Sequence, residues 1–116
     1  MASGTIAINP SSQLYLGGIV SFDWSVEGLK GNQNPRIQLM AYQDGEVVYG
    51  EAHNAEPKLG DPPFDGASFQ LGGASSQWLE NGGPADCVAT LYYWDNHPNQ
   101  VFVALASVEF HAEGAA

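Results

Sequence analysis

Cysteine chemistry is the first possibility that this 116-residue sequence raises, and it depends on a single residue, Cys87. One cysteine cannot form an internal disulfide, and a catalytic thiolate would need a histidine partner that the sequence does not locate. Cys87 alternates with Ala89 and Leu91, which predicts that all three side chains face an apolar core. The sequence therefore favours a buried, inert thiol.

Histidines and carboxylates are the other groups that could bind a metal or catalyse a reaction. His53, His97 and His111 lack the spacing of metal ligands, and we expect each at the surface: in a long loop, in a turn and at a frayed end. The aspartates do not follow the D-x-D-x-D-G pattern of a calcium loop, and no G-x-S-x-G, P-loop or dinucleotide-binding motif occurs. We therefore expect no catalytic residue, no metal and no cofactor, and a small hydrolase is the least favoured function.

The charge balance limits the partners that the chain can bind. The 13 acidic residues are opposed only by Lys30, Arg36 and Lys58, which gives a formal net charge of -10. Three scattered cations cannot form the basic footprint that a phosphate backbone or an anionic membrane needs, so we expect neither nucleic acid nor membrane as a partner. The acidity indicates a soluble surface, or one made to dock on a basic protein. The N-terminus shows no signal-peptide pattern and no apolar run approaches ~20 residues, so we expect synthesis in a cytoplasm.

The element that must position these side chains is the run Pro84–Trp94, which reads PADCVATLYYW. Its residues alternate with a period of two, as in a β-strand, and both alternating sets are largely apolar. Such a strand belongs in the middle of a sheet that is covered on both faces.

Shorter strands are predicted around this central run. Ile19–Glu27 alternates apolar and polar residues, as a strand with one solvated face does. Arg36–Gln43 and Glu46–Tyr49 flank Asp44-Gly45, which predicts a tight hairpin because both turn residues must accept a positive φ. Three further strands are predicted, at Thr5–Ile8, Ala67–Leu71 and Gln100–Phe110.

The segments between and after the strands carry weaker patterns. Gly50–Asp65 is rich in proline and is expected to be a long, irregular crossing loop, which is a kind of segment that is often functional. Ser75–Leu79 is expected to form one helical turn whose Trp78 and Leu79 plug one end of the core. The tail from His111 onward is expected to fray.

Together these runs predict an all-β fold, an immunoglobulin-like antiparallel β-sandwich of about seven strands. A small closed barrel is the alternative. The chain is expected to form a single domain, 1–116, with 5–110 as its ordered core. The residues predicted to be buried are Val20, Phe22, Trp24, Ile37, Leu39, Cys87, Ala89 and Leu91.

In such a sandwich, Arg36–Gln43 and the last two long strands share one sheet. If Cys87 and Leu91 face the core, the opposite face of that sheet carries apolar and aromatic side chains. An apolar outer face is a contact surface unless a loop folds over it, and the proline-rich loop is long enough to do so. The predicted partner-binding residues are Tyr42, Val88, Tyr92 and Trp94.

Three stretches carry a resemblance to known proteins: GGIVSFDWSVEG, PRIQLMAYQDGEVVYG and PADCVATLYYWD. From Thr5 to Phe110 the chain resembles the stand-alone immunoglobulin-like accessory proteins of tailed bacteriophages, particularly those of actinobacteria. It departs from true immunoglobulin domains because it has no second cysteine, Trp24 lies on the second strand, and Ala85 occupies the place of the corner tyrosine. The resemblance implies a fold and a virion setting rather than a particular binding site.

The expected function is that of a non-enzymatic virion accessory protein on the virion surface. The resemblance implies a decoration protein that binds the outside of the major capsid lattice, and self-association into an oligomer is a further possibility. The alternative, from another class, is a carbohydrate- or cell-surface-binding module of the tail. Its stacking platform would be Trp78, Tyr92 or Trp94.

Overall fold

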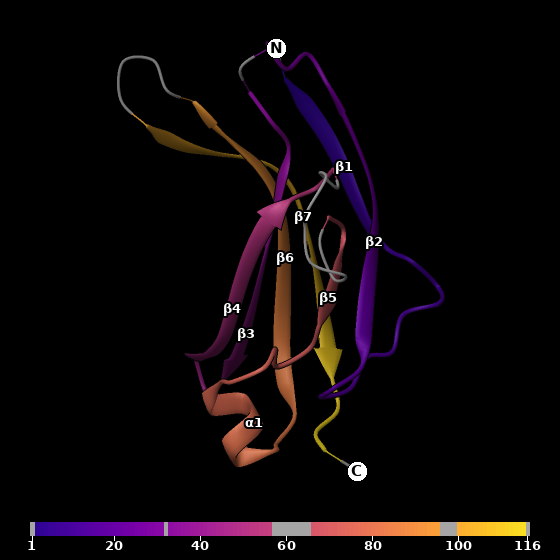
Figure 1. Cartoon of the computed structure of the whole chain (residues 1–116), viewed down its shortest axis with the longest axis vertical. Coiled ribbons are helices and arrows are strands. Elements are labelled where there is room, and N and C mark those ends of the chain that lie inside the picture. The colour runs from indigo at the N-terminus through magenta and orange to yellow at the C-terminus, as the bar shows by residue number, and fades with distance from the viewer. Residues whose placement is uncertain (1, 32, 57–65, 96–99, 116) are drawn as a thin grey trace.

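The computed structural model describes residues 2–31, 33–56, 66–95 and 100–115, which form an immunoglobulin-like sandwich of two antiparallel sheets (Figure 1). The three-stranded sheet has the order β1-β2-β5, with β1 at Ser3–Ile8, β2 at Ile19–Glu27 and β5 at Ser68–Gln70. The four-stranded sheet has the order β4-β3-β6-β7, with β3 at Arg36–Gln43, β4 at Glu46–Asn54, β6 at Ala85–Asp95 and β7 at Val101–Ala112. A short helix, α1 (Gln77–Asn81), lies at the lower end of the sandwich in Figure 1. The predicted fold class is confirmed.

β6 is the strand around which the four-stranded sheet is built, as its sequence predicts. It pairs with β3 on one side and with β7 on the other, so its backbone hydrogen bonds are made within the sheet on both sides. Side chains of a strand alternate between the two faces, so every second residue of β6 turns into the core. The register sets buried residues of β3 and β6 side by side, in the pairs Ala41–Cys87, Leu39–Ala89 and Ile37–Leu91.

The predicted core is confirmed at every position except Trp24. That side chain is only partly buried and packs against the margin of the core. β5 pairs only with Ile19–Ser21, so at Trp24 the strand has β1 on one side and no pairing with β5 on the other. Among the described residues, the largest fully buried side chains are instead Trp78 and Phe69.

The hairpin predicted at Asp44-Gly45 is confirmed, because it joins β3 to β4 and both residues have positive φ, at 52° and 82°. β4 is longer than expected and continues through Gly50 to Asn54. The prediction of an irregular loop from Gly50 is therefore wrong for its first residues, because 50–54 pair along β3. Residues 57–65 of that expected loop lie outside the described residues.

The helical turn predicted at Ser75–Leu79 is present as α1, but it lies two residues further along the chain. Ser76 is its N-cap, where the hydroxyl accepts a hydrogen bond from the Leu79 backbone amide, and Gly82 ends it in the left-handed conformation. Trp78 is fully buried as predicted, and its indole nitrogen donates to the Gly83 carbonyl at 2.7 Å. The prediction for Leu79 is wrong, because that side chain lies on the outer side of this single turn and is 39% exposed.

The C-terminal tail does not fray at His111 as predicted, because β7 runs to Ala112, which is fully buried. Beyond it, the Glu113 amide donates to the Leu14 carbonyl at 3.0 Å, and the Leu16 amide donates to the Glu113 carbonyl at 2.9 Å. The segment after β1 therefore adds to the end of β7. The backbone of this segment forms hydrogen bonds with Glu113, whose backbone groups would bond to water if the tail were frayed.

Candidate docking face

The single thiol, Cys87, is 1% exposed, which confirms that its side chain faces the core. Burial, with a smaller contribution from the neighbouring Asp86 carboxylate, raises the pKa of Cys87 to about 12. At neutral pH the thiol is therefore protonated, and the thiolate that a nucleophile requires does not form.

The histidines differ from their predicted places. His53 is on β4 rather than in a surface loop: it stacks on Phe69 with ring centroids 4.1 Å apart. Its two ring nitrogens each lie 2.9 Å from an oxygen, Nδ1 from the Gly66 carbonyl and Nε2 from the Glu51 carboxylate. These contacts tie the edge strand β4 to the start of β5. His97 lies outside the described residues.

His111 is exposed, as predicted, but on the ordered strand β7 rather than on a frayed tail. Its Nδ1 lies 3.0 Å from the Asp86 carboxylate, and its Nε2 lies 3.8 Å from Glu113. The hydrogen bond to Asp86, supported by the charge of Glu113, raises the pKa of His111 above 6.5. Within the described ranges, no group of three or more His, Cys, Asp or Glu side chains is placed to hold a metal ion.

The outer face of the four-stranded sheet, meaning the face turned away from the core, gathers all four predicted partner-binding residues. The register sets Tyr42 of β3 beside Asp86, Met40 beside Val88, and Arg36 beside Tyr92. These six side chains share one face because each is an even number of residues from the next along its strand. Trp94 continues the row on β6, and its partner across the hairpin is Phe102 on β7.

An aromatic cluster of Tyr92, Trp94 and Phe102 occupies one end of the outer face. The Phe102 ring stacks on Tyr92 with centroids 4.2 Å apart, and Trp94 meets both rings edge-on, at 5.8 Å and 5.6 Å. Arg36 lies over the Tyr92 ring, donates from Nε to the Tyr92 hydroxyl at 3.0 Å, and donates from Nη1 to Asn54 at 3.0 Å. The cluster is therefore held in one arrangement by ring contacts and by an arginine fork.

Tyr92 itself is not an exposed contact residue, because its side chain lies under its neighbours and is only 2% exposed. A bulge in the β6–β7 pairing between Leu91 and Tyr92 leaves Leu105 as an extra residue in β7. At this irregularity two successive residues of β6, Leu91 and Tyr92, are both buried. The exposed part of the cluster is Phe102, at 39%, together with the partly exposed Trp94.

Two members of this site, Phe102 and Arg36, are not among the residues predicted from the sequence to bind a partner. Phe102 was placed on an apolar strand without a function, although its alternation with Val101 and Val103 already sets it on the opposite face from those residues. Arg36 is the only cation in the run Arg36–Gln43, and a lone arginine at the start of an apolar strand is a signal for a partner nearby.

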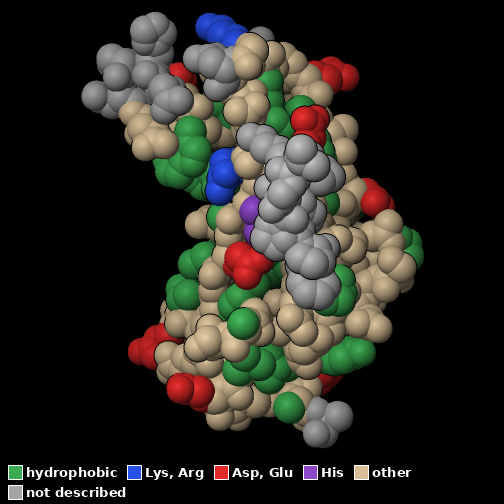
Figure 2. All heavy atoms as spheres, in the orientation of Figure 1, with side chains coloured by type: hydrophobic (Ala, Val, Ile, Leu, Met, Phe, Trp, Pro, Cys, Tyr) green, Lys and Arg blue, Asp and Glu red, His purple; other side chains and the backbone are tan. Residues whose placement is uncertain are grey.

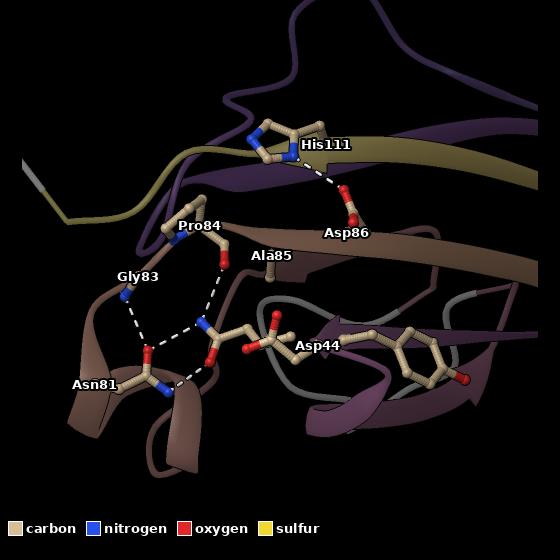
Figure 3. A pocket seen from close by; sticks show the side chains of 9 residues that line it. Asp44, Asn81, Gly83, Pro84, Ala85, Asp86 and His111 are labelled. Carbon is tan, nitrogen blue, oxygen red and sulfur yellow. Dashed lines mark hydrogen bonds and ion pairs between the residues drawn. The ribbon is translucent and has the colours of Figure 1, made fainter.

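The other end of the outer face carries carboxylates and a hollow of about 370 Å³ (Figure 3). Tyr42, Gln43 and Asp44 line the hollow from the β3–β4 hairpin, and Asn81, Asp86 and His111 line it from α1, β6 and β7. Gln43 and Asn81 exchange two amide hydrogen bonds, at 2.9 and 2.7 Å, and Gln43 also donates to the Pro84 carbonyl at 3.0 Å. Figure 3 shows these amide hydrogen bonds at Asn81, to one side of Asp44. They join α1 to the β3–β4 hairpin.

The stacking platforms proposed for a sugar-binding module are mostly inside the protein. Trp78 is fully buried and Tyr92 nearly so, which means that neither can lie against a sugar ring. Only Trp94 remains partly accessible, and its ring edges are engaged by Tyr92 and Phe102.

The described part of the chain contains no helix with the length and apolar character needed to span a bilayer. No family model matches this chain, and neither a curated protein nor a solved structure matches it.

Proposed function

We propose that this protein is a non-enzymatic virion accessory protein that docks on the outside of the major capsid lattice through the outer face of its four-stranded sheet. The observation that carries the proposal is the aromatic cluster, which presents Phe102 and part of Trp94 to solvent on the outer face. Its virion setting comes from the resemblance of the chain to phage accessory proteins.

The construction of the cluster supports docking on a protein. Aromatic side chains that are already fixed lose little conformational entropy on binding, and they are common among the anchors of protein interfaces. Here Tyr92 and Arg36 form a rigid base on which the exposed ring of Phe102 is stacked. Met40, Tyr42 and Val88 extend the face along the sheet, and all three are partly exposed.

A binding role is also consistent with the state of the thiol and of the two described histidines. The thiol is buried and protonated at neutral pH, and the His111 imidazole is paired with Asp86 at the surface. The ring of His53 is held between Glu51 and Gly66. These groups make their contacts within the fold, whereas Phe102 and part of Trp94 have surface available to a partner.

The test is cosedimentation of the purified protein with empty capsids assembled from the major capsid protein of the same genome. Phe102→Ala and Trp94→Ala should each weaken capsid binding by more than about 1 kcal/mol, with little change in the thermal midpoint. Leu79→Ala is the matched control, because Leu79 is a large apolar residue with the same exposed fraction as Phe102, 39%, and lies on α1 rather than on the sheet. Capsid binding by the Phe102 and Trp94 variants that equals binding by the Leu79 variant would contradict the proposal.

A further inference from the structure

The acidic end of the outer face, defined by Asp44, Asp86, Glu109 and Glu113, faces no cation of the described chain. Arg36 is at the opposite end of β3, where Tyr92 and Asn54 engage it, and Lys30 lies in the loop that leads into β3. Figure 2 shows the same separation on one side of the molecule: the blue side chains lie in the upper half, and the lower half shows red ones only.

Two hollows adjoin each other at this end, and they share Tyr42 and Asp86 as a common wall. The first, of about 370 Å³, is also lined by Asp44 and His111. The second, of about 360 Å³, is also lined by Val88 and Glu109. Each hollow therefore combines an aromatic ring with at least two carboxylate-bearing residues, which are the groups that bind a guanidinium or ammonium ion.

The hydrogen bonds around the first hollow leave these carboxylates available. Both amide hydrogens of Gln43 are used, on Asn81 and on the Pro84 carbonyl, so they are not offered to a ligand. The side-chain carboxylates of Asp44 and Glu109 make no hydrogen bond or ion pair with any described residue. Among the same residues, the Asp86 carboxylate contacts only the exposed His111. The walls of the hollow are thus fixed in place, while its charged groups remain free to accept hydrogen bonds.

We propose that the acidic end binds Arg or Lys side chains from a basic segment of the protein on which the outer face docks. This inference rests on the proposed function and adds to it the chemistry of the partner. The aromatic cluster anchors the partner, and the acidic end fixes the orientation of the complex through charge. A second copy of the chain is the wrong occupant because it carries a net charge of -10.

The direct test is a titration of the ¹⁵N-labelled protein with a hexa-arginine peptide at about 0.15 M salt, where exposed charges are largely screened beyond ~8 Å. We expect chemical-shift changes at Tyr42, Asp44, Asp86, Val88, Glu109 and His111. Asp86→Asn should weaken binding about twofold to fivefold, the range of an exposed ion pair. Glu27→Gln, an exposed carboxylate at the end of β2, is the matched control and should leave the affinity unchanged. Shifts spread over all the carboxylates, or an equal loss in the Glu27 variant, would overturn the inference.

Capsid binding then separates this inference from the proposed function. If both hold, Asp86→Asn lowers the salt dependence of capsid binding, whereas Phe102→Ala weakens binding at every salt concentration. If Phe102→Ala weakens binding and Asp86→Asn leaves its salt dependence unchanged, the proposed function stands and the basic partner is wrong. Shifts at the same residues with a neutral disaccharide in place of the peptide would also overturn the inference, in favour of a sugar ligand.

Discussion

The two ends of the outer face are built on the same three strands, β3, β6 and β7, yet different interactions hold them in place. At the aromatic end, three rings and one arginine pack on one another. At the acidic end, an amide pair between Gln43 and Asn81 joins the hairpin to α1, and the carboxylates project from that frame. One continuous sheet can therefore carry an aromatic end and a charged end, because strand geometry sets only the spacing of the side chains and not their chemistry.

Of the substitutions that compare the two ends, Trp78→Ala should cause the largest loss of stability, because Trp78 lies inside the molecule beneath the acidic end. The substitution removes a fully buried aromatic ring and its hydrogen bond to the Gly83 carbonyl. We expect a loss of about 3–5 kcal/mol in the free energy of unfolding, measured by chemical denaturation.

Trp24→Ala is the control for that substitution, since Trp24 is a tryptophan that is only partly buried. We expect it to cost about 1–2 kcal/mol. Equal losses in the two variants would mean that the position of a tryptophan in the sandwich does not determine its contribution to stability.

An intermediate effect is expected at the aromatic end from Arg36→Gln. This change removes the hydrogen bonds from Arg36 to Tyr92 and Asn54, as well as the cation over the Tyr92 ring. We expect the free energy of unfolding to fall by about 1–3 kcal/mol, since the nearly buried Tyr92 hydroxyl loses its donor. Arg36→Lys keeps the charge but not the planar fork, so it should recover only part of the loss.

Lys30→Gln serves as the control for Arg36→Gln, because Lys30 is an exposed cation outside the cluster. Its effect should stay within about 0.5 kcal/mol. If Arg36→Gln proved as mild as Lys30→Gln, the rings alone would hold the aromatic end, and the contrast between the two ends would be one of charge only.

The smallest effect is expected at His111, whose contact with Asp86 lies at the exposed surface of the acidic end. Because the pKa of His111 is raised above 6.5, the imidazolium–carboxylate contact contributes to stability fully below about pH 6.5. That contribution disappears as the pH rises through the raised pKa. An NMR titration should place the midpoint above 6.5, and Asp86→Asn should lower it. A midpoint that the Asp86 variant leaves unchanged would show that the contact is absent in solution.

Local patterns were sufficient to predict most of the fold. The period of two in Pro84–Trp94 predicted a central strand, and Asp44-Gly45 predicted the hairpin, because both signals lie within a few adjacent residues. The sequence does not predict the continuation of β4 past Gly50, since glycine and histidine carry little strand preference. Pairing with β3 determines the structure of residues 50–54.

The candidate site was predicted only in part, because some of its features arise only when strands pair. Tyr42, Val88, Tyr92 and Trp94 were correctly placed on one face of the sheet. Tyr92 is buried under Phe102, Trp94 and Arg36, beside a bulge that leaves Leu105 of β7 without a partner. A bulge is a property of two strands in register, which neither strand encodes alone. The cooperation of Phe102 and Arg36 with Tyr92 likewise appears only once the three strands are aligned.

The hydrogen bonds between the segment after β1 and the end of β7 have a consequence for how the protein is made. Leu14 and Leu16 pair with Glu113, and β7 supplies one edge of the four-stranded sheet. These contacts join residues that are about a hundred positions apart, so the sandwich cannot close until β7 and Glu113 have left the ribosome. Contacts between residues so distant in sequence also make folding slow. A nascent chain should therefore stay open on the ribosome until Glu113 has emerged.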